Sequence, residues 1–405
     1  MTASRYDPAV PGIEVSERIR RLQELVVPLF EFFVRNEELR AALVGDLSDF
    51  MAGNPQEMAS EEYVETLRRW STPRAPDWFA YKESIPQARA AAAASLRERL
   101  GIPFEDDDLC MTNAAIAALA VAIRTVADVG DEVVIVRPPH FLYEPLIMAA
   151  GARAVRVSVD PKTFDLDVDS VAGVLSDRTR AIIVNTPHNP TGKVFPAGTL
   201  ERLASVLEEA SNRQRTLYLL SDEAYNRIVF DGRRFESPAA FYPNTMLIYS
   251  YGKQLLAPSE RIGYIALPPT MPGRKEMRMA LLTSQLATGY AFPNGVLQYA
   301  LGDLERISVD MDILQRRRDL MVEALRDMGY ELHVPEATFY LLIRSPIPDD
   351  RQFTDMLAEE RILVMPGTML EAPGYFRISL TASDDMIERS LPGFARAMKR
   401  AAGDS

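Results

Sequence analysis

The chain has 405 residues, of which 47% are hydrophobic and 25% charged, an ordinary composition for a globular protein of two or three domains. Its net charge of −12 argues against a nucleic-acid partner and, more weakly, against an anionic membrane. A single cysteine, Cys110, excludes a disulfide within the chain and fits a reducing compartment, so we expect a cytoplasmic protein. The sequence also lacks a signal-peptide pattern, a long apolar run that could span a membrane, and metal-ligand spacing.

The N-terminal part predicts helices joined by turns. Apolar residues recur every three or four positions from Val15 to about Leu43, which predicts a helix that Pro28 kinks or divides. Gly53-Asn-Pro55 predicts a turn. The aromatic run Trp78-Phe-Ala-Tyr81 precedes an alanine-rich segment, Pro86 to Leu100, for which we predict a helix.

From about residue 111 onward, short apolar runs alternate with helical segments. Because strands that alternate with helices form parallel sheets, this pattern predicts an α/β fold with a mainly parallel sheet and helices on both faces. A helix is expected from Leu200 to about Ala210, between two of the strands. The predicted strands are 133–136, 152–159, 180–185, 217–220, 246–249 and 262–267.

The C-terminal part predicts a smaller α+β domain. A crossover helix is expected within residues 297–330, followed by strand and turn signals at Pro335–Tyr340 and Val364–Gly367. We therefore expect a large domain over residues 76–310. The small domain is expected to combine an N-terminal segment, 1–75, with residues 311–405.

Three polar stretches follow three predicted strands directly. They read NTPHNPTGK at residues 185–193, SDEAY at 221–225 and SYGK at 250–253, and the last is followed by Arg261. Ligands of open α/β sheets bind outside the carboxyl ends of the strands. The three stretches therefore predict one binding site at that edge of the sheet.

The residue types in the third stretch suggest a specific chemistry. A lysine in an apolar setting just past a strand, here Lys253, can lose its proton and attack a carbonyl to form a Schiff base. Arg261 can bind a phosphate through two hydrogen bonds. Taken alone, Lys253 is one of 45 basic residues, most of which are expected on the surface.

Together, NTPHNPTGK, SDEAY, SYGK with Arg261, and Tyr375-Phe-Arg-Ile-Ser379 resemble the class I/II aminotransferases, pyridoxal-phosphate enzymes of fold type I. The resemblance extends over about residues 50–390. It implies a fold type I large domain, a homodimer, and transfer of an amino group between an α-amino acid and a 2-oxo acid. The implied cofactor is pyridoxal 5′-phosphate.

The resemblance also implies roles for residues around the cofactor ring. Lys253 would form the Schiff base and, once displaced by substrate, move a proton as general base and acid. Asp222 would keep the pyridine nitrogen protonated, so that the ring can accept negative charge from the substrate. Asn189 and Tyr225 would donate to the phenolic oxygen of the ring. Taken alone, Asp222 could instead cap a helix.

The cofactor phosphate would be bound by Ser250, Arg261 and the backbone amides of Ala114 and Ala115. These alanines lie in Met111–Leu119, which matches a family turn that usually carries a glycine where Ala114 stands. Amides at the N-terminus of a helix form a natural phosphate site, and they need no side chain. Tyr81 would cross the dimer interface to the partner's phosphate, although the glycine usual a few residues later is missing.

Two further positions are implied by the same resemblance. An aromatic ring usually stacks on the cofactor, and His140 or its neighbour Phe141 takes this place; an imidazole there can titrate near neutral pH. The substrate carboxylate would be bound by Arg377, by the backbone of Gly53 and by Asn189.

The motifs concern cofactor and carboxylate binding, so they leave the reaction open. The first interpretation is an aminotransferase. The second is another pyridoxal-phosphate reaction on an amino acid, catalysed by a lyase, oxidase, cyclase or synthase. A third, a regulator that binds the cofactor without catalysis, is disfavoured by the intact lysine and by the lack of a DNA-binding appendage. The side-chain specificity is not readable from these motifs.

Overall fold

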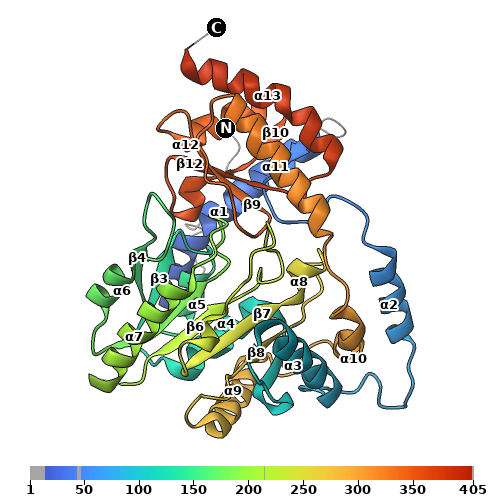
Figure 1. Ribbon diagram of the computed structural model, residues 1–405, viewed down its shortest axis with the longest axis vertical. Coiled ribbons are helices and arrows are strands. Elements are labelled where there is room, and N and C mark those ends of the chain that lie inside the picture. Colours follow the sequence, from blue (N-terminus) through green and yellow to red (C-terminus); the bar gives the residue numbers. More distant parts are fainter. Residues whose placement is uncertain (1–13, 43–46, 214, 404–405) are drawn as a thin grey trace.

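A computed structural model describes residues 14–42, 47–213 and 215–403 of the chain. Figure 1 shows a broad twisted sheet with helices around it and, above the sheet, a smaller region of helices and short strands. No helix in the described ranges is both long and apolar enough to cross a membrane.

Within the described ranges, the large sheet has seven strands in the order β2-β8-β7-β6-β5-β3-β4. All neighbouring pairs are parallel except those of β8, which runs antiparallel to both β2 and β7. The prediction of a mainly parallel sheet is therefore confirmed. The strands are β2 (Leu109–Thr112), β3 (Glu132–Arg137), β4 (Arg153–Ser158), β5 (Thr179–Asn185), β6 (Tyr218–Asp222), β7 (Thr245–Ser250) and β8 (Gly263–Ala266).

Both faces of this sheet are buried, which explains why its central strands are apolar without interruption. In β5, Ala181 and Ile183 join one core cluster, whereas Ile182 and Val184 join another on the opposite face. Successive side chains of a strand point to opposite faces, so a strand covered on both sides needs apolar residues at every position.

Helices form the two covering layers (Figure 1). Helices α4, α5 and α9 cover one face of the sheet, and α3, α6, α7 and α10 contribute to the clusters on the other. The helices in chain order are α1 (Glu17–Ala42), α2 (Glu61–Ser71), α3 (Pro86–Leu100), α4 (Ala114–Val126), α5 (Tyr143–Ala149), α6 (Val168–Val174), α7 (Ala197–Arg213), α8 (Tyr251–Gln254), α9 (Arg274–Thr288), α10 (Gly295–Leu304), α11 (Met311–Asp327), α12 (Asp350–Glu359) and α13 (Asp384–Ala402).

The smaller region is built around an antiparallel sheet of β11 (Met365–Pro366), β12 (Tyr375–Ser379) and β9 (Tyr340–Arg344). Helices α11, α12 and α13 pack on it around a core that includes Phe353, Phe376 and Phe394. The N-terminal segment reaches this region, because β1 (Ser48–Asp49) pairs in parallel with β10 (Ile362–Leu363).

Two details of the predicted helices differ in the structure. Of the two alternatives for Pro28, division of the helix is wrong, because α1 is continuous through this residue. The single crossover helix expected within residues 297–330 is two helices, α10 and α11, which are separated by residues 305–310. Asp310 caps the N-terminus of α11 by accepting from the amides of Asp312 and Ile313, which explains why a new helix begins there.

Gly192, within the NPTGK stretch, connects the two regions. Its carbonyl accepts hydrogen bonds from the amides of Glu336 and Ala337, at 2.9 and 3.0 Å. Its φ of +71° is left-handed, and an added Cβ would lie 2.3 Å from the Cβ of Pro335. Glycine is therefore required at this position both by the backbone conformation and by the close approach of the segment that carries Pro335.

We expect Gly192→Ala to lower the thermal unfolding midpoint markedly, by the equivalent of about 2–5 kcal/mol, because backbone strain and a backbone clash add together. Gly232→Ala is the matched control: its φ is +64°, but nothing lies within 4 Å of the new Cβ. That variant should lose only about 1 kcal/mol. Equal losses in calorimetry would show that the contact with Pro335 is unimportant.

Candidate active site

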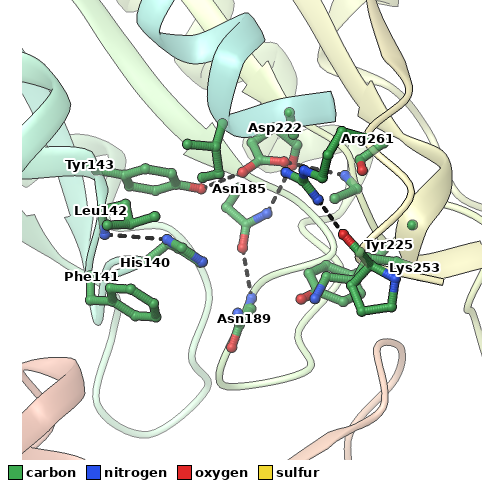
Figure 2. Close-up of a pocket in the computed structure, with 16 residues that line it drawn as sticks. His140, Phe141, Leu142, Tyr143, Asn185, Asn189, Asp222, Tyr225, Lys253 and Arg261 are labelled. Carbon is green, nitrogen blue, oxygen red and sulfur yellow. Dashed lines mark hydrogen bonds between the residues drawn. The ribbon is translucent and has the colours of Figure 1, made fainter. Parts of the chain in front are cut away.

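Three parallel strands place their terminal polar residues at one edge of the large sheet. β5 ends at Asn185 and β6 at Asp222, and these two residues are direct partners in the ladder. β7 ends at Ser250, and α8 follows immediately with Lys253. A cavity of about 210 Å³ lies at this edge (Figure 2). Its lining is Ala115, Ile116, His140, Phe141, Leu142, Tyr143, Asn185, Asn189, Asp222, Ala224, Tyr225, Ser250, Gly252, Lys253, Pro258 and Arg261.

Asp222 is a buried carboxylate in this cavity, 6% exposed. The hydroxyl of Tyr143 donates to its Oδ2 at 2.6 Å (Figure 2), and the amide of Ala224 donates to Oδ1 at 3.3 Å. Burial raises the pKa of Asp222, while these two hydrogen bonds and the charge of Lys253 lower it. A carboxylate in this setting is stabilised by any cation that enters the cavity beside it.

Lys253 stands in an aromatic setting. Its Nζ lies 5.7 Å from the ring centroid of Tyr225 and 5.6 Å from that of Phe339. Figure 2 shows Lys253 and Tyr225 on the opposite side of the cavity from His140 and Phe141. The amine therefore faces a space that is bounded by Asp222 on one side and by aromatic rings on the others.

A second part of the cavity is suited to an anion. Ser250 and Arg261 line it, and among the described residues Arg261 donates only to the backbone carbonyl of Pro258. The N-terminus of α4 reaches the same place through Ala115 and Ile116. The N-cap residue of that helix, Asn113, makes no side-chain cap, so the first amides of α4 stay available to a ligand.

Ala114 begins α4 with a φ of +64°, the left-handed conformation that favours glycine. The sequence comparison with the family had placed Ala114 where a glycine is usual, and the backbone keeps the corresponding shape. Its packing is tight as well, because a Cβ on Gly263 would lie 3.0 Å from the Cα of Ala114. Gly263 thus allows β8 to approach the start of α4.

His140 and Phe141 both line the cavity, and their rings stack on each other with centroids 4.5 Å apart. The geometry leaves open which of the two would stack on a ligand. The pKa of His140 is lowered to about 3, mainly by burial and further by the charges of Lys253 and Arg377. The imidazole is therefore neutral at physiological pH, in contrast to the expectation that it titrates near neutrality.

Arg377 is 5% exposed and extends from β12 towards the large sheet. Its Nη1 donates to Oδ1 of Asn189 and its Nη2 to the carbonyl of Met51, both at 3.1 Å. The Nε is buried and has no hydrogen-bond partner among the described residues. A buried N–H without a partner is costly, and a carboxylate is a suitable acceptor for it.

Eight of the twelve residues predicted for the site line this one cavity: Ala115, His140, Asn189, Asp222, Tyr225, Ser250, Lys253 and Arg261. The other four lie elsewhere. Arg377 contacts the cavity through Asn189, and Ala114 is buried beneath Gly263. Gly53 lies against the hydroxyl of Tyr340, and Tyr81 is 88% exposed, away from this cavity.

Three polar residues of the site are not among the predicted ones. Tyr143 and Asn185 both bind Asp222, and Tyr340 lies under Arg377, whose Cζ is 4.0 Å from the ring centroid. Asn185 could have been found, since it ends a predicted strand. Tyr143 and Tyr340 had no signal beyond an aromatic residue, because their partners are distant in sequence.

The sequence profile described as "Aminotransferase class I and II" matches residues 47–392. The aspartate/prephenate aminotransferase of Thermus thermophilus is 31% identical over 370 residues, covering 88% of this chain and 92% of the relative. An aminotransferase structure from Eubacterium rectale superposes with a TM-score of 0.87 at 30% identity, covering 96% of this chain and 99% of that one. The aspartate aminotransferase structure of Thermotoga maritima gives a TM-score of 0.81 at 26% identity, covering 94% and 99%.

We expect Tyr143→Phe to lower stability by about 1.5–3 kcal/mol at a pH where Asp222 is ionised, because a hydrogen bond to a buried charge is lost. Burial already raises the pKa of Asp222 in the folded state. Tyr143→Phe raises the pKa of Asp222 further. The loss of stability is therefore full at a pH above the folded-state pKa of Asp222. It becomes smaller as falling pH protonates Asp222 in both the wild type and the variant.

Chemical denaturation of the cofactor-free protein across pH measures this loss. Tyr330→Phe is the control, because it removes a buried hydroxyl that donates to a neutral carbonyl, that of Phe394, at 2.9 Å. Its cost should not change with pH. A pH-independent cost for Tyr143→Phe would contradict the assignment of an ionised Asp222.

Proposed function

Because the chain belongs to the class I and II aminotransferase family and transfers an amino group between an amino acid and a 2-oxo acid, we propose that pyridoxal 5′-phosphate is its cofactor and that Lys253 holds it covalently. The observation that carries the proposal is the combination, around one cavity, of an enclosed lysine, a buried carboxylate and an anion-binding corner.

The donor set fits each part of that cofactor. Asp222, a buried carboxylate whose pKa is raised by burial, suits a protonated ring nitrogen. Ser250, Arg261 and the first amides of α4 suit the phosphate. Asn189 and Tyr225 line the same cavity and would donate to the ring oxygen, and His140 or Phe141 would cover a ring face.

When bound, the cofactor supplies an electron sink for the bonds at the substrate Cα. The chain supplies the rest of the chemistry. The Nζ of Lys253 would take up and return the proton at the substrate Cα as general base and acid. Asp222 would hold a protonated ring nitrogen, and Tyr143 orients Asp222 through its 2.6 Å hydrogen bond. The rings of Tyr225 and Phe339 border the amine, with centroids 5.7 and 5.6 Å from the Nζ.

Arg377 binds the substrate α-carboxylate in this proposal. Its unpartnered Nε supports the assignment, and Asn189 and the Met51 carbonyl hold the guanidinium in position. Gly53 follows Met51 by two residues, lies against Tyr340 and Phe339, and would contribute its backbone amide. The Thermus relative is named for aspartate and prephenate, so aspartate as donor and prephenate as acceptor are the first pair to test.

The two half-reactions test this function. Adding an amino donor alone should change the visible absorbance of the cofactor, and adding a 2-oxo acid should restore it. A panel of donors with 2-oxoglutarate and pyruvate then defines the specificity. Turnover without any 2-oxo acid, releasing ammonia, carbon dioxide or peroxide, would favour a different pyridoxal-phosphate reaction and contradict transamination.

We expect Lys253→Ala to abolish the covalent link to the cofactor and to lower turnover by about 10²–10⁴-fold or more, since Lys253 is the one lysine among the residues that line the cavity. Mass spectrometry after borohydride reduction measures the link, and steady-state assays measure turnover. Lys275→Ala, which removes an exposed lysine, is the control and should behave like the wild type. Full activity of Lys253→Ala would remove this lysine from the mechanism.

We also propose that the chain is a homodimer whose partner covers an exposed aromatic surface formed by Phe79, Tyr81 and Phe292. Phe79, Tyr81 and Phe292 are exposed by 68%, 88% and 45%, and the rings of Tyr81 and Phe292 lie 5.1 Å apart. Exposed aromatic groups of this kind mark protein interfaces. Tyr81 is then free to reach the cofactor phosphate of the partner.

Sedimentation should give twice the 45.3 kDa mass of the chain. Phe292→Glu should shift the protein towards monomer and lower its activity, because a charge is forced into an apolar interface. Leu320→Glu is the control, since Leu320 is similarly exposed, at 40%, but lies on α11 in the smaller region. A fully active monomer would contradict the proposed dimer.

A further inference from the structure

Residues 305–310 form a connector between α10, which packs on the large sheet, and α11, which packs in the core of the smaller region. The connector passes beside α8, the helix of four residues that carries Lys253 (Figure 1). A helix of a single turn is not stable by itself. The position of Lys253 therefore depends on the side chains that anchor α8 to its surroundings.

Gln254 directly follows this lysine and is 1% exposed. Its Nε2 donates to the carbonyls of Leu304 and Ile307, at 3.2 and 2.5 Å, and its Oε1 accepts from the hydroxyl of Tyr249 at 2.7 Å. Its backbone carbonyl accepts from the amide of Val309 at 2.8 Å. Because carbonyl oxygens can only accept, this position needs the NH2 group that glutamine supplies.

The residue two positions before Lys253 is bound to the same connector. The hydroxyl of Tyr251 donates to the carboxylate of Glu305, and the Nη2 of Arg227 donates to the same carboxylate. The Nη1 of Arg227 donates to the backbone carbonyl of Glu305 at 3.1 Å. The side chains of Arg227 and Glu305 are 10% and 9% exposed, so this ion pair is shielded from solvent. Helix α8 is therefore bound to the connector on both sides of Lys253.

The connector leads directly into the smaller region. Val309 packs against the core of that region, and so does Leu256, three residues after Lys253. Leu256 has a φ of +46°, a left-handed conformation that is unfavourable for leucine and that its packing must stabilise. The same core includes both neighbours of Arg377 in β12. Packed and hydrogen-bonded groups thus join the lysine to the strand that carries the arginine.

We propose that Gln254 is a positioning residue: its side-chain amide holds the connector against α8 and thereby fixes the amine of Lys253 relative to the smaller region and Arg377. The inference rests on the proposed function for the roles of Lys253 and Arg377. Proton transfer at the substrate Cα needs the amine within hydrogen-bond reach, and a displacement of about 1 Å can lower the rate by about a hundredfold. Because Arg377 would bind the substrate carboxylate, Gln254 would set the amine against the bound substrate.

The first test uses the cofactor-free protein. Gln254→Met keeps the length of the side chain and removes its three hydrogen bonds, so hydrogen exchange at Val309 and within α8 should become about tenfold faster or more. Gln298→Met is the matched control, because Gln298 is also buried and binds the Ile85 amide and the Pro293 carbonyl, at 2.9 and 3.1 Å. It should leave exchange at these sites unchanged. Unchanged exchange in Gln254→Met would overturn the proposal.

The second test uses the protein loaded with pyridoxal phosphate, with covalently loaded sites counted by borohydride reduction and mass spectrometry. In a single turnover, an amino donor should change the visible absorbance about ten- to a hundredfold more slowly per loaded site in Gln254→Met than in the wild type. Deuterium at the substrate Cα should slow the variant further, because proton transfer limits its rate. A purely structural loss would lower the number of loaded sites and leave the rate per site unchanged, as we expect for Gln298→Met.

A wild-type rate per loaded site in Gln254→Met, or a slower rate without an isotope effect, would contradict the positioning role. If that variant does not fold, Gln254→Glu keeps the shape, and its carboxyl group can donate only while it is protonated. Its rate relative to the wild type should therefore fall as rising pH ionises this group, and a ratio that is independent of pH would count against the proposal in the same way.

The outcome is separable from the proposed function. A wild type that does not bind the cofactor or react with an amino donor would contradict that function, whereas hydrogen exchange in the cofactor-free protein reports only on how Gln254 holds the connector.

Discussion

A carboxylate buried at the end of a parallel sheet is the constraint on which the site depends. Asp222 is only 6% exposed at the end of β6, and a buried charge needs polar neighbours from the fold to replace the water it has lost. β5 brings Asn185, whose side chain donates to the Asp222 carbonyl, and the loop after β3 leads to Tyr143, which donates to the carboxylate. A cation in the cavity would also stabilise the buried carboxylate, and a protonated ring nitrogen would be such a cation.

The second constraint is that the site is shared between two regions of the chain. Arg377, on a strand of the smaller region, reaches Asn189 of the large sheet region and the carbonyl of Met51. Gly192 connects the regions through backbone hydrogen bonds a few residues from Asn189. Because Arg377 and Lys253 come from different regions, the distance between the guanidinium and the amine is set by how these regions pack.

Much of the fold could be predicted from local pattern. Strands β3, β5, β6 and β7 are apolar at nearly every position, because both faces of the sheet are covered. A run of apolar residues can be recognised in the sequence without knowing which residues it contacts. The helix predicted from Pro86 to Leu100 has those bounds in α3. The division near residue 305 was missed because a cap at Asp310 is a weak signal within a long helical pattern.

Which polar groups follow the central strands can be read from the sequence, and parallel strands bring their carboxyl ends to one edge. This was enough to predict that Asn189, Asp222, Ser250 and Lys253 lie together. The neighbours of these residues depend on tertiary packing. The protonation state of His140 depends on its burial near two cations, and the positions of Tyr143 and Tyr340 depend on partners far away in sequence. Burial and charged neighbours depend on contacts between residues that are far apart in sequence. The periodicity within one segment does not predict such contacts.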